Sequence, residues 1–130
     1  MLSKQEISDW FEVKKTMGVD WWDIKVDNEL DNGNMGECVA EPSQTEAEIS
    51  FKGGMKRADF VKTAIHEAMH CHTSELREYV SNEVFKLVAR DKAQKIEKRV
   101  HELEEEIVLA VESIVWNLVK ERYTSKTRKQ

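Results

Sequence analysis

Residues 58–72 combine an apolar stripe at helical spacing with a polar face, and they constrain the fold more than any other segment. The apolar positions follow the i, i+3, i+4 pattern of a helix packed on one side, and they are Val61, Ala64, Ile65, Ala68 and Met69. The other face carries His66 and His70 within the sequence HEAMH, which has the pattern H-E-x-x-H. A helix is therefore expected to begin near Ala58–Asp59, with both histidines turned away from the core.

The first third of the chain predicts a helix, a strand and a loop. The helix should begin at Ser3, because Ser3 and Glu6 fit a capping box, and it should end at Gly18. Residues 21–26 include apolar side chains that alternate with charged ones, which is the period of a strand. Residues 27–37 are rich in Asn, Asp and Gly and are expected to form a loop.

The pattern around the H-E-x-x-H segment predicts one more strand and two more helices. Residues 47–51 alternate apolar and polar side chains just before the motif helix. Thr73-Ser74 resembles the N-cap of a separate helix over residues 76–88. A long last helix should end near Arg122, and its apolar positions are Ile96, Val100, Leu103, Ile107, Ala110, Val111, Ile114 and Leu118.

Strands followed by helices predict an α+β fold. Because 130 residues suit one domain, residues 1–122 are expected to form a single, mostly helical domain with a small antiparallel sheet. Residues 123–130 are polar and basic, and we expect a disordered tail there. Within the sheet, Ile49 and Phe51 are expected in the core, although strand 47–51 could instead pair with an extended peptide at an edge.

Composition excludes several classes of protein. The chain is 40% hydrophobic and 35% charged, which is typical of a soluble globular protein. A net charge of −5 makes nucleic acid an unlikely partner. There is no run of 18 apolar residues for a membrane span, and no apolar leader at the N-terminus. Only Cys38 and Cys71 are present, so free thiols and a cytoplasmic location are expected, while the oligomeric state is left open.

The H-E-x-x-H pattern has a geometric meaning on a helix. Residues four apart lie one above the other, so His66 and His70 could both bind one zinc ion at about 2.0–2.1 Å. Glu67 is displaced by roughly 100°, so it could reach a water beside the metal without binding the metal itself. The alternative is an exposed helix whose histidines are solvated or paired with carboxylates.

Two histidines need a third ligand, because catalytic zinc takes three from the protein. The last predicted helix offers Glu104, Glu105, Glu106 and His101. If its apolar stripe faces the core, Glu104 lies roughly 50° from the centre of that stripe and Glu105 roughly 150° away. A glutamate inside an apolar face needs a counter-charge, and zinc would supply one. Glu104 is therefore the first candidate, with Glu106, Glu105 and His101 as alternates and a solvated acidic face as the competing interpretation.

The motif resembles that of the H-E-x-x-H zinc metallopeptidases, and in particular the small gluzincin-type proteins of phages and prokaryotes. In those proteins a strand precedes the motif helix and a glutamate on a later helix completes the metal site. The segment Glu104-Glu105-Glu106-Ile107-Val108 is similar to that later helix. The resemblance covers roughly residues 47–120, although the 33 residues between His70 and the late helix are a longer connection than in the tightest members.

The resemblance implies a zincin-like fold, a zinc cofactor and hydrolysis of a peptide or protein substrate. Glu67 would act as general base, and an oxyanion partner is also required, with Tyr79, His72 and His101 as candidates. The alternative is a non-catalytic, zinc-stabilised binding module, such as a phage accessory or inhibitor protein that acts on a host factor. An intact Glu67 favours the enzyme, because a purely structural site needs no general base.

Overall fold

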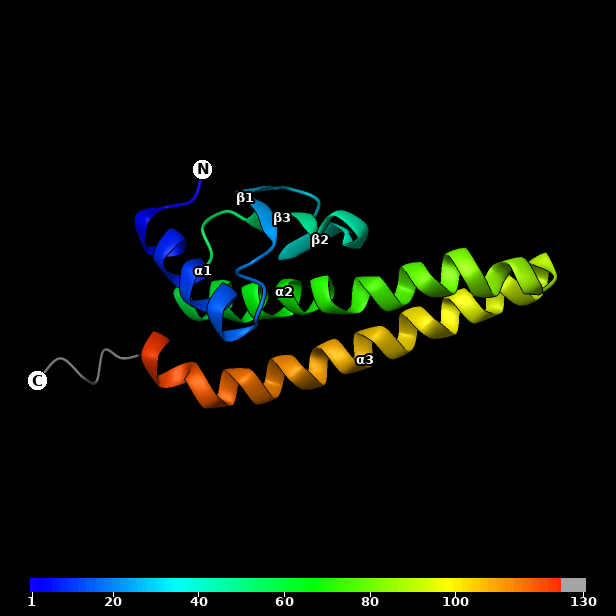
Figure 1. The fold of residues 1–130 in the computed structure, drawn as a ribbon. Helices are drawn as coiled ribbons and strands as arrows, with labels where there is room; N and C mark the ends of the chain where they lie inside the picture. The colour runs from blue at the N-terminus through cyan, green and yellow to red at the C-terminus, as the bar shows by residue number, and fades with distance from the viewer. Residues whose placement is uncertain (125–130) are drawn as a thin grey trace, which may run out of the picture.

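The computed structural model describes residues 1–124 and shows a mostly helical α+β fold, as predicted (Figure 1). The elements in chain order are α1 (Lys4–Thr16), β1 (Asp23–Leu30), β2 (Gly36–Glu41), a 3-10 turn (Pro42–Gln44), β3 (Glu46–Lys52), α2 (Arg57–Tyr79) and α3 (Arg90–Tyr123). Of the predicted tail, Tyr123 belongs to α3 and is buried, so the last helix extends beyond residue 122. Residues 125–130 lie outside the described part of the chain.

Helix α1 begins and ends as its sequence predicts. The Ser3 hydroxyl accepts a hydrogen bond from the Glu6 N–H at 3.1 Å, and the Glu6 carboxylate accepts one from the Ser3 N–H at 2.9 Å. These two bonds satisfy backbone donors that have no partner within the helix. Gly18 follows the last turn with φ +70°, a left-handed conformation that favours glycine. The helix buries Trp10 and Val13 against the core.

The sheet has three strands in the order β1-β3-β2, and it is mixed rather than antiparallel. Strand β3 pairs parallel with β1 and antiparallel with β2, because it inserts between the two preceding strands. Strand β2 was not predicted, since its first residues lie in a segment that reads as a loop. The central position of β3 confirms Ile49 and Phe51 as core residues and leaves no free edge on β3 for a peptide.

Helices α2 and α3 form a long antiparallel hairpin, with the sheet and α1 on the other side of α2 (Figure 1). The predicted helix break at Thr73-Ser74 is wrong, because α2 continues to Tyr79. The Ser74 hydroxyl donates back to the carbonyl of Cys71, and the Thr73 hydroxyl donates across to Glu104 on α3, so neither acts as an N-cap. A π-helical turn over Val80–Val84 and a 3-10 turn over Phe85–Leu87 connect the two helices in place of the predicted helix 76–88.

The core lies where α2 meets the sheet and α1. The predicted stripe on α2 is confirmed at its first four positions, from Val61 to Ala68, while Met69 is half-buried. Phe60 adds an aromatic contact to Phe51, with ring centroids 4.5 Å apart. Cys71 is buried, its Sγ atom lies 4.0 Å from that of Cys38, and both thiols are free, as expected. None of the described helices is both long and apolar enough to be a candidate membrane span.

Helix α3 packs against α2 with a different face from the one predicted. Val108 and Val119 are buried, as is Glu104. By contrast, members of the predicted core stripe are exposed, with fractions of 41% for Leu103, 48% for Ile107, 60% for Ile114 and 79% for Leu118. The observed contact face is displaced from the apolar stripe by about one residue, or roughly 100° around the helix. This displacement changes which glutamate can reach the histidines.

Candidate metal centre

His66 and His70 project from α2 toward α3, with ring centroids 5.0 Å apart. A single carboxylate on α3 meets both rings: the Glu105 oxygens lie 3.0 Å from His70 Nε2 and 3.7 Å from His66 Nε2. One ligand atom from each residue lies within 4.8 Å of the others. The structure thus brings together both predicted histidines and one of the alternates for the third ligand.

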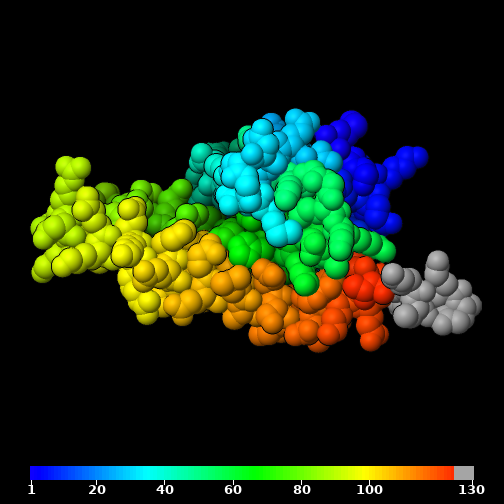
Figure 2. All heavy atoms as spheres, turned by 180° about the vertical axis from the view of Figure 1, so that it is seen from behind, coloured from blue at the N-terminus to red at the C-terminus, as the bar shows by residue number. Residues whose placement is uncertain are grey.

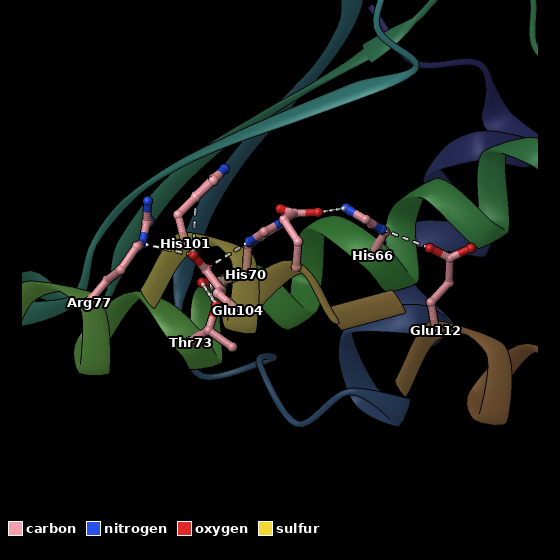
Figure 3. Close-up of polar contacts among 8 residues, drawn as sticks. His66, His70, Thr73, Arg77, His101, Glu104 and Glu112 are labelled. Carbon is pink, nitrogen blue, oxygen red and sulfur yellow. Dashed lines mark hydrogen bonds and ion pairs between the residues drawn. The ribbon is translucent and has the colours of Figure 1, made fainter. Parts of the chain in front are cut away.

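The other nitrogen of each imidazole contacts a second carboxylate. His66 Nδ1 lies 2.7 Å from a Glu112 oxygen, and His70 Nδ1 lies 2.9 Å from a Glu104 oxygen (Figure 3). The Glu112 hydrogen bond raises the pKa of His66 above its usual value. In metalloproteins, a carboxylate on the far nitrogen orients the ring and fixes which nitrogen faces the metal. Here that arrangement leaves both Nε2 atoms on the side of Glu105.

The first candidate for the third ligand, Glu104, occupies a supporting position instead. Its side chain is only 4% exposed and is held from three sides by His70, Thr73 and Arg77 (Figure 3). The Thr73 hydroxyl donates to the same oxygen that contacts His70 Nδ1, and Arg77 Nε lies 3.1 Å from the other oxygen. Burial alone would raise the pKa of Glu104, but these hydrogen bonds and the Arg77 charge lower it below the usual value.

Of the remaining predicted site residues, some line the cleft that holds the histidines and others face away from it. Glu106 is 67% exposed and pairs with Arg99, so it faces away from the site. His101 lines the same cleft, with Nδ1 3.9 Å from a Glu104 oxygen. Tyr79 is 62% exposed and is not among the residues that line the cleft, while the His72 ring contacts the carbonyl of Met17. Of the oxyanion candidates, only His101 therefore lies in the cleft.

Glu67 is buried between the histidines and strand β2. Gly36 allows this close packing, because a Cβ atom there would lie 2.5 Å from Thr63 Cγ2 and 3.0 Å from Glu67 Oε2. Burial raises the pKa of the Glu67 carboxyl above its usual value. Within residues 1–124 the Glu67 carboxylate makes no hydrogen bond, so its oxygens remain available to water or a ligand.

These residues line an open cleft of about 660 Å³ between β2, α2 and α3. From behind the molecule, the green residues of α2 show between the cyan segment that leads into β2 and the yellow-to-orange α3 (Figure 2). Gly36 and Cys38 bring β2 to one wall of the cleft, and Glu105 and Glu112 bring α3 to the other. The volume lies within the range of about 300–1,000 Å³ that is typical of ligand pockets.

Sequence reasoning missed Glu112 and misplaced Glu105. The available signal was the spacing, because residues 105 and 112 lie two helical turns apart on one face, just as residues 66 and 70 lie one turn apart. Because α3 runs antiparallel to α2, Glu105 lies beside His70 and Glu112 lies beside His66. The apolar pattern of α3 concealed this relation, because it indicated the wrong face as buried.

Two imidazole nitrogens and one carboxylate oxygen are a ligand set that suits zinc and leaves a position open for water. The observed convergence on one side of the rings fits that ion. No protein family model, no curated protein and no solved structure matches this chain.

Proposed function

We propose that this protein is a zinc-dependent metallopeptidase that uses Glu67 as its general base. The observation that carries the proposal is the convergence of His66, His70 and Glu105, with a carboxylate on the far nitrogen of each imidazole. A solvated histidine face would account for one such ion pair. It does not account for two oriented rings whose remaining nitrogens meet at the same third side chain.

The charge of the cleft supports a bound cation. Four carboxylates lie around the two imidazoles, and they belong to Glu67, Glu104, Glu105 and Glu112. Apart from histidines, the positively charged side chains that line the cleft are Arg77 and Lys62. Glu67 and Glu104 are both largely buried. Burial of carboxylates without enough positive charge is costly, and a divalent ion would offset that cost.

The proposed roles follow from the positions of the side chains. Zinc, when bound, supplies a Lewis acid that polarises a carbonyl and lowers the pKa of a water molecule. Glu67 would accept a proton from the attacking water and then pass it to the departing amine. Its raised pKa suits both steps, because a general base works best when its pKa approaches the working pH. His101 is the candidate to donate a hydrogen bond to the developing oxyanion.

The position of β2 supports a peptide as substrate. Strand β2 is an edge of the sheet, and its first residues line the cleft beside Glu67. An unpaired strand edge can bind an extended peptide through backbone hydrogen bonds. The free edge of β2 thus replaces β3, which the sequence had suggested, as the place for strand addition.

The test compares metal content and hydrolysis in matched variants. Purified protein should contain close to one zinc ion per chain, and it should cleave members of a mixed peptide library, followed by mass spectrometry. Glu67→Gln should retain the zinc and lose cleavage. Glu106→Gln is the control, because it changes the same residue type on the outer face of α3 and should alter neither.

The alternative of a zinc-stabilised binding module predicts a different result. The ligands join two long helices, so the metal would also stabilise the hairpin without catalysing a reaction. In that case the protein would bind zinc, no library peptide would be cleaved, and Glu67→Gln would leave the biological activity unchanged. Protein that cannot be loaded with zinc at all would refute both functions.

A further inference from the structure

The chain has only two cysteines, and the fold brings them together. Cys38 lies on β2 and Cys71 on α2, 33 residues apart in the sequence, and their Sγ atoms are 4.0 Å apart. Neither thiol takes part in a disulfide. At this distance one thiol donates a weak hydrogen bond to the other, and either sulfur can be the donor. Residues so distant along the chain meet here because β2 packs against α2 (Figure 1).

The two thiols differ in their access to solvent. Cys71 is completely buried in the core. Cys38 is half-buried and is one of the residues that line the cleft beside Glu67. A small oxidant in the cleft can therefore reach the sulfur of Cys38 but not that of Cys71. An accessible thiol with a second thiol poised beside it is an arrangement found in proteins whose cysteines are reversibly oxidised.

We propose that Cys38 and Cys71 are a modification site, at which a peroxide oxidises the two thiols to a disulfide that joins β2 to α2. A disulfide has an S–S bond of about 2.05 Å, so the two sulfurs must approach by about 2 Å. Strand β2 already lies close to α2, since a Cβ atom at Gly36 would be 2.5 Å from Thr63 Cγ2. Rotation of the two cysteine side chains can supply the remaining movement.

The reaction consumes one peroxide and releases two water molecules. In the first step the Cys38 sulfur attacks one oxygen of hydrogen peroxide, the O–O bond breaks, and the departing hydroxide takes up the thiol proton as water. Cys38 is then a sulfenic acid. In the second step the Cys71 sulfur attacks the Cys38 sulfur, the S–O bond breaks, and hydroxide leaves with the proton of Cys71 as a second water. The two sulfurs lose two electrons in total, and the peroxide gains them.

The first step is expected to be slow. The hydrogen bond with Cys71 and burial raise the pKa of Cys38 above its usual value. The thiolate is the form that attacks an oxidant, so only a small fraction of Cys38 is reactive at a given moment. The second step needs no encounter in solution, because Cys71 already lies beside Cys38. The sulfenic acid should therefore be converted to the disulfide faster than it forms.

The disulfide would fix the wall of the cleft next to Glu67. Glu67 precedes Cys71 by four residues, so both lie on one face of α2. Closing a loop of 33 residues restricts the unfolded chain, and Tm should rise by roughly 5–15 °C. The inference requires neither a bound metal nor hydrolysis of a peptide. It therefore stands or falls separately from the proposed function.

Mass spectrometry and thiol counting test the disulfide. The full chain, with a chelator present to exclude metal-catalysed oxidation, is incubated for hours with equimolar hydrogen peroxide. Both thiols should be lost, and a digest made without reductant should contain Cys38 and Cys71 in one linked peptide pair, lighter by about 2 Da than the two free peptides. Dithiothreitol should restore both thiols and return Tm to the value of the reduced protein.

Two matched variants test the order of the steps. In Cys71→Ser the accessible thiol is retained without its partner, so a sulfenic acid should accumulate at Cys38 and be trapped by dimedone. In Cys38→Ser the buried thiol is retained alone, so Cys71 should stay reduced and take up no dimedone. Each variant replaces one sulfur by oxygen, and circular dichroism verifies that each is folded.

Several results would overturn the inference. Wild-type protein that keeps both thiols after this treatment would exclude the disulfide, as would cross-links that form only between chains. Equal labelling of Cys38→Ser and Cys71→Ser by dimedone would overturn the assignment of Cys38 as the thiol that meets the oxidant. A Tm that falls on oxidation would overturn the stabilising role of the disulfide.

Discussion

Removal of three different glutamates on α3, one at a time, should affect zinc affinity to three different degrees. In the proposed zinc site Glu105 is a ligand and Glu112 supports His66, whereas Glu106 faces the solvent. Each is replaced by alanine, so that the helix propensity does not fall and the lost side chain is the same. Any difference between the variants then reports the position of the carboxylate and not its chemistry.

The sizes follow from the role and exposure of each side chain. Structural zinc with four ligands is bound by about 10–16 kcal/mol, so one ligand contributes about 2.5–4 kcal/mol, and Glu105→Ala should lose roughly 70- to 900-fold in affinity. Loss of a supporting carboxylate costs about 10- to 100-fold. Glu112→Ala belongs near the lower limit, because the Glu112 side chain is 24% exposed and water can replace it beside His66. Glu106→Ala should change nothing.

The assay is competition for zinc against a chromophoric chelator of known affinity, at one pH and ionic strength. Circular dichroism of each metal-free variant verifies that α3 is retained. The reasoning would be refuted if Glu106→Ala lost as much affinity as Glu105→Ala, or if Glu104→Ala abolished binding while Glu105→Ala preserved it. The second result would restore Glu104 as the third ligand.

Two further predictions concern the packing and the charge of Glu67. Gly36→Ala should lower the free energy of unfolding by about 1–3 kcal/mol, because the added methyl would overlap Thr63 Cγ2; urea denaturation measures this, and an unchanged midpoint would contradict the close contact between β2 and α2. In the metal-free protein, the raised pKa of Glu67 means that the folded state binds the proton more tightly than the unfolded state. Ionisation of Glu67 therefore lowers the free energy of unfolding as pH rises. Glu67→Gln should therefore stabilise the metal-free protein at pH 7 and lose that advantage at about pH 4, near the ordinary pKa of a carboxyl; an equal effect at both pH values would show that burial of the charge is not the cause.

The candidate site illustrates how metal binding and folding can depend on the same contacts. Glu104 joins the ring of His70 to Arg77 and Thr73, so it connects both helices of the hairpin while it orients the ring of a proposed ligand. A carboxylate in this position contributes to the rigidity of the site as well as to its charge.

Local sequence determined the features that depend on neighbours along the chain. The capping box of Ser3 and Glu6 set the start of α1, because its partners are three residues apart. The helical spacing in α2 placed its apolar stripe inward and His66 and His70 together on another face, since residues four apart always share a face of a helix. These relations hold wherever the helix docks, and the structure confirms them.

Only the tertiary structure decided which face of α3 meets α2, and therefore that Glu105 and not Glu104 lies between the two histidines. Helical periodicity gives the angles between residues of one helix, but the rotation of that helix against its neighbour depends on both surfaces. In α3 the most apolar stripe is exposed, so the rule that apolar residues face the core favoured Glu104, whereas Glu105 is the glutamate that contacts both rings. The mixed sheet arose in the same way, because the insertion of β3 between β1 and β2 depends on contacts between strands that are distant in the sequence.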